Sequence, residues 1–339
     1  MKMKTNFERI AVIGGGSWGT ALAGRLAAKG HDTLLWAFEP ELVNEINSSH
    51  TNSLYLPGIR LHPALACTGN IREAVSGRGI VLLVTPVQVM RSVLKQLVPH
   101  ISADAVIANA SKGIELETLF SVSQICEELL GDHVLSRYVA LSGPTFAREV
   151  AQELPSLIVA ASRNNDSAKR IQAALSGPSL RVYTNSDVVG VELGGAVKNV
   201  IAIAAGISDG LDFGYNARAA LITRGLLEMT RLGQALGAHA STFAGLAGMG
   251  DLVLTCTGDL SRNRTVGFKL GQGQRLADIL AEMRMVAEGV KSAESVYLLS
   301  RRLGVEMPIV EKTYQILHED KPARQAVIEL MARDLKAEG

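Results

Sequence analysis

The chain has 339 residues, a formal net charge of +1, and hydrophobic and charged fractions of 47% and 20%. This length is sufficient for two domains with sizeable cores, and the composition is typical of a globular protein rather than a disordered one. The near-zero charge, without a long basic block, argues against nucleic acid or a membrane surface as the main partner. No run approaches the roughly 20 apolar residues of a membrane helix, so we expect no membrane span.

The three cysteines, Cys67, Cys126 and Cys256, are far apart and odd in number. They have neither the spacing of a zinc site nor an evident pairing. We therefore expect no metal and a reducing compartment, which favours the cytoplasm. The charged N-terminal segment is followed by glycine-rich sequence and carries no cleavage signal.

A glycine motif stands near the N-terminus. Residues Arg9–Ile13 are predicted to form a short buried strand and Thr20–Lys29 a helix. Between them, Gly14, Gly16 and Gly19 form G-x-G-x-x-G. The first permits a tight turn, the second lets backbone approach a pyrophosphate, and the third lets helix pack on strand. The helix N-terminus supplies N–H groups for phosphates. We predict a dinucleotide site; the alternative is a glycine-rich turn of another α/β fold.

The segment after the second predicted strand, Asp32–Trp36, is expected to meet the adenosine of such a cofactor. Glu39 stands about 20 residues past the glycines, where an acid bonds the adenosine ribose, and Phe38 is able to stack on adenine. Alternatively, Glu39 is a solvated residue at a helix start. No arginine for a 2′-phosphate stands nearby in sequence, which leans toward NAD but leaves the choice between NAD and NADP open.

Further strand-like runs alternate with helical segments. The predicted strands are Ile80–Thr85, Ala105–Ala110, Tyr138–Leu141, Ser156–Ala161 and Leu180–Thr184, and the helices between them include Gln88–Leu97 and Thr118–Leu130. This alternation predicts an α/β fold of the Rossmann type, with a mostly parallel sheet and helices on both of its faces.

Polar residues follow three of these strands. Ligands of such sheets lie beyond the carboxyl ends of the strands. Those ends carry Thr85-Pro86, Ser111-Lys112-Gly113 and Ser142-Gly143-Pro144-Thr145. Lys112 is therefore either a ligand-binding residue or a surface turn residue.

Helical patterns predominate after Asp187. The predicted helices are Val188–Ile207, Ala217–Leu236, Ser241–Leu246, Arg262–Leu270, Arg275–Met283, Ser292–Leu303 and Pro308–Leu317. We expect two domains: a dinucleotide-binding Rossmann-type domain over residues 1–188 and an all-helical substrate and catalytic domain over residues 189–339.

The first of these helices carries Lys198 inside a long apolar run. At helical periodicity its face is shared mostly by small residues such as Gly194 and Gly195, whereas bulky residues such as Ile203 lie behind. Two glycines cost about 1 kcal/mol each in a helix, so the pattern indicates space beside the ammonium for a small substrate. The alternative is a close helix contact with Lys198 reaching water. The neighbouring Asn199 favours a catalytic site, because buried polar groups need partners.

Two later segments also indicate a site. Three glycines precede Asp251 within Gly245–Leu252, which suggests backbone brought close to another element, or else a turn capped by Asp251. Ser261 is suited to cap a helix, and Arg262 and Asn263 would present donors at its positive end, as in a phosphate or carboxylate site. The alternative is a cap followed by solvated arginines.

Six motifs together resemble one known family. In chain order they are G-G-G-S-W-G-T-A-L-A, S-K-G-I-E, L-S-G-P-T-F-A-R-E-V, G-G-A-V-K-N-V-I-A-I, G-M-G-D-L-V-L-T-C-T and S-R-N-R. From about Ile10 to His318 the chain resembles the bacterial NAD(P)-dependent sn-glycerol-3-phosphate dehydrogenases. The resemblance implies a Rossmann-type N-terminal domain, an all-helical C-terminal domain and a homodimer. It also implies interconversion of dihydroxyacetone phosphate and glycerol 3-phosphate with NAD or NADP, which supplies phospholipid synthesis.

The resemblance implies roles for the residues at matching positions. The catalytic positions are Lys198, the family's lysine, and the polar residues around the reacting carbons, Lys112, Asn199, Asp251 and Thr255. The substrate-binding positions are Lys112, Gly143, Thr145, Lys198, Asp251, Ser261, Arg262 and Asn263. The cofactor-binding positions are Gly14, Gly16, Ser17, Trp18, Gly19, Phe38, Lys112, Ala147, Arg262, Val286 and Glu288.

The implied chemistry centres on Lys198. Reduction of a ketone builds negative charge on oxygen, which an ammonium stabilises and then neutralises by giving up its proton. Lys198 is therefore the expected acid in reduction and the base in oxidation. Burial and the nearby Lys112 would lower its pKa, whereas Asp251 would raise it, and the sequence leaves this balance open.

Three other classes of protein compete with this interpretation. Dehydrogenases of 3-hydroxy acids or 6-phosphogluconate typically carry a polar amide four residues after their lysine, where this chain has Ala202. Nucleotide-sugar dehydrogenases need a nucleophilic cysteine, and Cys256 has no histidine nearby in sequence. A non-catalytic NADH sensor would keep the glycine turn without needing both Lys198 and Arg262.

Overall fold

The computed structural model describes residues 7–283 and 287–334. Within these residues, eight strands form one sheet in the order β3-β2-β1-β4-β5-β6-β7-β8. Neighbouring strands are parallel except for β6 and β7, which are antiparallel. The strands are β1 (Arg9–Ile13), β2 (Asp32–Trp36), β3 (Ala66–Thr68), β4 (Ile80–Leu83), β5 (Val106–Asn109), β6 (Tyr138–Ser142), β7 (Ser156–Ala161) and β8 (Leu180–Asn185). The predicted mostly parallel sheet is confirmed.

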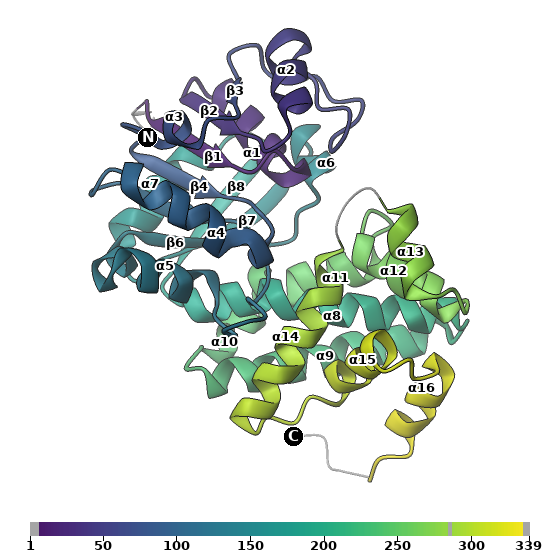
Figure 1. Ribbon diagram of the computed structural model, residues 1–339. Coiled ribbons are helices and arrows are strands. Elements are labelled where there is room, and N and C mark those ends of the chain that lie inside the picture. Colours follow the sequence, from purple (N-terminus) through teal and green to yellow (C-terminus); the bar gives the residue numbers. More distant parts are fainter. Residues whose placement is uncertain (1–6, 284–286, 335–339) are drawn as a thin grey trace.

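Helices cover both faces of this sheet (Figure 1). Along β1, Ile10 and Val12 belong to the core on one face, whereas Ala11 and Ile13 belong to the core on the other. Successive strand side chains point to opposite faces, so a strand covered on both sides reads as a continuous apolar run. The helices of this half are α1 (Ser17–Ala28), α2 (Pro40–Ser49), α3 (Ile71–Val75), α4 (Val87–Leu97), α5 (Val122–Leu130), α6 (Ala147–Ala151) and α7 (Asn165–Leu175).

One predicted helix begins later than its pattern suggested. The helix expected over Thr118–Leu130 starts only at Val122, because Ser121 and Gln124 form a capping box there. Leu119 has a positive φ of 61°, which a continuing right-handed helix does not allow. The sequence patterns predicted no element at β3, α3, α6, α7 or α11 (Asp251–Thr257), and they indicated α2 only through the alternative that Glu39 stands at a helix start.

The rest of the described chain is helical, as predicted. Its helices are α8 (Val188–Gly210), α9 (Gly214–Ala235), α10 (Ala240–Phe243), α11 (Asp251–Thr257), α12 (Arg262–Gly271), α13 (Leu276–Glu282), α14 (Glu288–Leu303), α15 (Pro308–His318) and α16 (Ala323–Met331). Figure 1 shows α8 running through the middle of this half, where it packs against α9, α11, α12 and α14. A short π-helical turn, η3 (Leu246–Gly250), precedes α11.

Helix α8 is long and apolar enough to cross a membrane, so the expectation that no run approaches that length is wrong. Its most apolar window is 89% buried within the protein, which supplies its apolar surroundings. Small residues allow this tight packing. A Cβ added at Gly206 of α8 would lie 2.1 Å from the Arg264 carbonyl oxygen, and one at Gly267 of α12 would lie 2.0 Å from the Ile203 carbonyl oxygen. The backbones of α8 and α12 are therefore in direct contact.

The cores of the two halves are largely separate. One apolar cluster is built from α8, α9 and the later helices, whereas two others lie on the faces of the sheet. The first turns of α8 contribute Val188 and Val191 to a sheet cluster. The division into domains between residues 188 and 189 stays a prediction.

Candidate active site

A cleft of about 960 Å³ runs from the glycine turn to the start of α12. The sheet half lines it with the β1–α1 turn, the ends of β2 and β4, and residues 110–112 and 145–148. The helical half lines it with residues of α8, α11 and α12 and with Glu288. Most predicted site residues line this cleft. Gly19, Gly143 and Asp251 are not part of the lining, and Val286 lies outside the described residues.

The three glycines of the turn differ in their surroundings. A Cβ at Gly14 (φ 127°) would lie 2.7 Å from the Val84 carbonyl oxygen, and one at Gly19 would lie 1.9 Å from the Gly14 carbonyl oxygen. Gly16, at the N-cap of α1, has no atom within 4 Å of such a Cβ and faces the cleft. Crowding at the first and third glycines and open backbone at the second fit a bound pyrophosphate at the helix N-terminus.

The expected adenosine end of the cleft contains a contact that the sequence did not indicate. Phe38 is 80% exposed and lines the cleft. The Tyr55 hydroxyl donates to the Glu39 carboxylate at 2.6 Å, and this hydrogen bond raises the pKa of Tyr55 to about 12. Ser17 donates to the Tyr55 carbonyl oxygen at 2.6 Å. Glu39 stands at the N-cap of α2 but makes no side-chain cap bond, so its carboxylate faces the cleft together with Tyr55.

At the other end, two lysines share one carboxylate. Lys198 of α8 donates to Asp251 and, at 2.9 Å, to the Thr255 hydroxyl. Lys112 donates to the second Asp251 oxygen at 2.6 Å. Asp251 is fully buried and Lys198 is 5% exposed. Ser142, at the end of β6, also donates to Asp251 at 3.3 Å, a contact that sequence spacing did not reveal.

The charges of this cluster determine the pKa values of its members. Burial lowers the pKa of Lys198 to about 7; the attraction of Asp251 opposes this shift and the repulsion of Lys112 adds to it. Burial alone would raise the pKa of Asp251, but Lys112 and Lys198 together hold it below its ordinary value. One buried carboxylate thus faces two ammonium groups, and burial makes Lys198 give up a proton more readily than a solvated lysine.

Asp251 reaches this position as the first residue of α11, with Gly250 at the N-cap. The alternative of a turn capped by Asp251 is therefore wrong. The close backbone approach expected around it is confirmed, since a Cβ at Gly194 of α8 would lie 2.4 Å from the Ala247 carbonyl oxygen. Because Thr255 lies one helical turn after Asp251, both side chains face α8.

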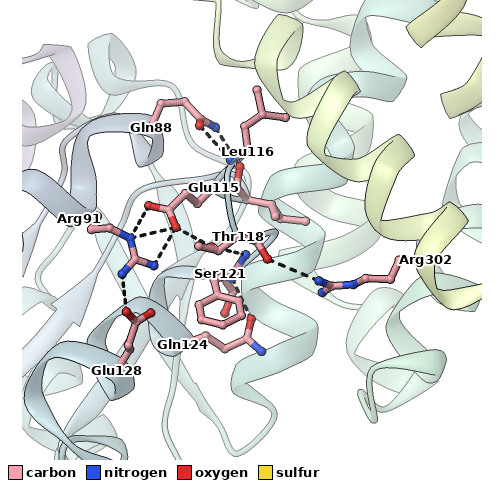
Figure 2. Close-up of polar contacts among 11 residues, drawn as sticks. Gln88, Arg91, Glu115, Leu116, Thr118, Ser121, Gln124, Glu128 and Arg302 are labelled. Atoms are coloured by element: carbon pink, nitrogen blue, oxygen red, sulfur yellow. Dashed lines mark hydrogen bonds and ion pairs between the residues drawn. The ribbon is translucent and has the colours of Figure 1, made fainter.

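Lys112 lies on the loop between β5 and α5, which is held from both halves of the protein. Figure 2 shows Arg91 of α4 donating to both oxygens of the buried Glu115, at 2.8 to 3.1 Å. Glu115 also accepts the Thr118 hydroxyl, and Arg302 of α14 donates to the Thr118 carbonyl oxygen at 3.5 Å. The surface-turn alternative for Lys112 is wrong, because its ammonium is bound to the buried Asp251.

The start of α12 faces the same cleft. Ser261 caps the helix by accepting from the Arg264 N–H at 3.3 Å, as its sequence position suggested. The Asn263 amide donates to the Asn199 side chain at 2.9 Å and accepts from the Gly289 N–H at 3.0 Å, so it joins α12 to α8 and α14. Arg262 is exposed at the cleft. Burial raises the pKa of Glu288, and the charge of Arg262 opposes that shift.

A glycine turn suited to a dinucleotide and a buried lysine cluster in one cleft define a dinucleotide-dependent oxidoreductase. Family models of the NAD-dependent glycerol-3-phosphate dehydrogenase N-terminus and C-terminus match residues 9–168 and 187–328. The chain therefore belongs to the NAD-dependent glycerol-3-phosphate dehydrogenase family, as the sequence motifs predicted.

Individual relatives agree with this assignment. The chain is 69% identical to an NAD(P)+ glycerol-3-phosphate dehydrogenase of Trichlorobacter lovleyi, over 97% of this chain and 99% of the relative. It is 65% identical to one of Geobacter sulfurreducens, over 98% and 99%. The crystal structure of glycerol-3-phosphate dehydrogenase from Coxiella burnetii has a TM-score of 0.92 at 40% identity and covers 96% of this chain and 99% of its own.

Proposed function

We propose that this protein interconverts dihydroxyacetone phosphate and sn-glycerol 3-phosphate, with NAD or NADP as hydride carrier. One observation carries the proposal: the buried Lys198 ammonium lines the same cleft as the glycine turn and is held there by Asp251 and Thr255. The activity for which the relatives of Trichlorobacter lovleyi and Geobacter sulfurreducens are named supports it.

The cleft has the features that a dinucleotide requires. Gly16 and the N-terminus of α1 would hold the pyrophosphate, and Phe38 would stack on the adenine. Ala147 and Glu288 line the cleft between this end and the lysine cluster. When bound, the nicotinamide cofactor supplies the hydride in reduction and accepts it in oxidation.

Lys198 donates the proton of the reaction in one direction and accepts it in the other. In reduction its ammonium donates to the substrate oxygen as negative charge develops there, and in oxidation the neutral amine takes the hydroxyl proton. Asp251 and Thr255 fix the position of the nitrogen, and Lys112 adds a second positive charge next to the same carboxylate. A lowered pKa suits both directions, because acid and base forms are then accessible near neutral pH.

The start of α12 would hold the substrate phosphate. Arg262 offers a planar fork of donors at a helix N-terminus capped by Ser261, and both the fork and the helix dipole favour a dianion. Asn263, fixed by Asn199 and Gly289, keeps this end at a set distance from Lys198 on α8. Binding energy at the phosphate thereby orients the reacting carbon.

We further propose that the protein is a cytoplasmic homodimer whose product supplies phospholipid synthesis. Its three cysteines are free and buried, which suits a reducing compartment. Light scattering coupled to size-exclusion chromatography tests the dimer: a mass of twice 36.0 kDa is expected, and a monomer at working concentration would contradict it.

The central experiment is a purified-enzyme assay with dihydroxyacetone phosphate, run separately with NADH and NADPH. We expect turnover with the phosphorylated ketone and a much lower kcat/KM with dihydroxyacetone. Comparable values for the two ketones would remove the argument for a phosphate site. NADH binding without turnover of either ketone would favour a sensor over an enzyme.

A further inference from the structure

The carboxylate of Glu192 lies where α8 meets the sheet half. It accepts the Tyr138 hydroxyl of β6 at 2.5 Å, the Ser123 hydroxyl at 2.5 Å and the Ser123 N–H at 3.1 Å. The side-chain amide of Asn109, the last residue of β5, donates at 3.5 Å to the oxygen that accepts the Tyr138 hydroxyl, whereas the Ser123 hydroxyl donates to the other oxygen. One side chain of α8 therefore contacts β5, β6 and the first turn of α5.

The contacts with Asn109 and Tyr138, and α8 itself, lead from Glu192 to the lysine cluster. Asn109 holds the backbone of Ser111 through bonds of 3.0 and 3.3 Å, and Lys112 follows directly. The strand that begins with Tyr138 ends at Ser142, which donates to Asp251. On α8 itself, Lys198 follows Glu192 by six residues, or about 9 Å of helix.

The charge of Glu192 is balanced only by dipoles. Among residues 7–283 and 287–334 it forms no ion pair, and burial raises the pKa of its carboxyl group although hydrogen bonds oppose the shift. Part of the residue stays accessible to solvent, but its oxygens are occupied by Tyr138 and Ser123. Such an anion is costly compared with an apolar contact, which points to a need for fixed geometry at this junction.

We propose that Glu192 is a positioning residue that fixes α8 against β5 and β6 and thereby sets the placement of Lys198 and Lys112 about Asp251. Glu192 touches none of the reacting groups of the proposed function, on which this inference rests. Its effect passes through Asn109 to the Lys112 loop, through Tyr138 to the strand that ends at Ser142, and along α8 to Lys198.

Two variants test this role. Glu192→Gln removes the charge and leaves a single acceptor oxygen for the Tyr138 and Ser123 donors. Tyr138→Phe keeps the charge and removes one hydrogen bond. The matched control is Glu228→Gln: Glu228 is a buried carboxylate of α9 that caps α15 through the Ile309 and Val310 N–H groups. Within the part of the chain that the structure describes, Glu228 forms no hydrogen bond or ion pair with Lys112, Lys198 or Asp251.

The measurements are kcat and KM for dihydroxyacetone phosphate and NADH over a pH range, expressed per NADH-binding site counted by fluorescence titration. We expect Glu192→Gln to lower kcat roughly 10- to 100-fold, the scale of small misplacements at a reacting centre, with both KM values within threefold. Tyr138→Phe should lower kcat several-fold. Loosening the grip of Asp251 on Lys198 should also move the pH midpoint of kcat downward in both variants, whereas partial unfolding would leave the midpoint unchanged.

The control separates positioning from stability. Glu228→Gln alters the hydrogen bonds of a buried carboxyl group and should change the melting temperature without changing kcat per site by more than twofold. If Glu192→Gln fails to fold, the kcat and the pH midpoint of kcat of Tyr138→Phe test the inference instead. Unchanged kcat and midpoint in the foldable variants, or an equal kcat loss in the Glu228→Gln control, would overturn the inference while leaving the proposed function intact. A wild-type protein that binds NADH but does not reduce dihydroxyacetone phosphate would overturn both.

Discussion

Replacing Lys198 by methionine keeps the length of the side chain and removes its charge. The structure indicates that the fold tolerates this change. Lys198 is 5% exposed and lies in an apolar helix, and Asp251 keeps its ion pair with Lys112 at 2.6 Å, so no buried carboxylate is left without a cation. Cofactor binding at the glycine turn should remain close to normal, whereas kcat should fall roughly 100- to 10,000-fold, the range of general acid–base terms.

The pH dependence of the wild-type enzyme tests the same role of Lys198. Burial lowers the pKa of Lys198 to about 7. Reduction needs the ammonium, so its kcat/KM should fall about tenfold per pH unit above that pKa. Oxidation needs the neutral amine, so its kcat/KM should rise about tenfold per pH unit below that pKa and level off above it. Methionine cannot titrate, and both slopes should be lost in the variant.

The assay follows NADH absorbance in both directions from about pH 5.5 to about pH 9.5, a range that covers both sides of the pKa of Lys198, with NADH affinity measured separately by fluorescence. Asn199→Ala removes a polar side chain next to Lys198 without removing the proton donor, so it should keep both pH slopes even where its kcat/KM falls through the lost bond to Asn263. Reduction that stays flat up to pH 9, or a Lys198→Met kcat within a few-fold of wild type, would show that another group carries the proton.

Three further predictions concern other parts of the chain. Arg262→Lys keeps the positive charge but loses the planar fork of donors, so kcat/KM for dihydroxyacetone phosphate should fall roughly 10- to 150-fold. The kcat/KM for dihydroxyacetone should stay within a few-fold of wild type. Equal losses for the two ketones would show that Arg262 does not bind the phosphate. The added Cβ of Gly16→Ala meets no atom within 4 Å, so this variant should weaken NADH binding without lowering the melting temperature. The added Cβ of Gly19→Ala meets the Gly14 carbonyl oxygen at 1.9 Å, so this variant should lower the melting temperature. The reverse pattern would contradict the roles assigned to the two glycines. Burial raises the pKa of Glu228 to about 7, so the stability it contributes is present below about pH 4.5 and is lost as pH rises through 7. The unfolding free energy of wild type relative to Glu228→Gln, from urea titrations, should therefore fall by about 1 kcal/mol per unit between pH 5 and 7, and a constant difference would refute it.

Local patterns were sufficient for most of the fold. The period of apolar residues predicted β1, α4, α8 and α12 to within a few residues, because each buries a face whose repeat is visible in sequence. The pattern was least informative where a few side chains override propensity. At Thr118–Ser121, a hydroxyl bound to Glu115 and a positive φ at Leu119 delay a helix that the apolar spacing alone would start earlier.

The candidate site likewise contains residues that the local sequence indicates and contacts that it does not. The glycine turn, Lys198 and the capped start of α12 each have a signature within a few residues of sequence. The Tyr55 bond to Glu39 and the Ser142 bond to Asp251 join residues 16 and 109 positions apart, and nothing local to either partner marks them. Such contacts depend on how strands and helices assemble in space, which a single sequence pattern does not encode.

Asp251 illustrates why the chemistry depends on this assembly. In sequence it follows three glycines and resembles a cap; in the folded protein it begins α11 and is fully buried between the ammonium groups of Lys112 and Lys198. With one lysine, the ion pair would oppose the effect of burial and favour a charged Lys198. With two, the carboxylate is shared and the second cation acts with burial to lower the pKa of Lys198. A proton that Lys198 can both give and take near neutral pH is thus a property of three elements, β5 with its loop, α8 and α11, meeting at one carboxylate.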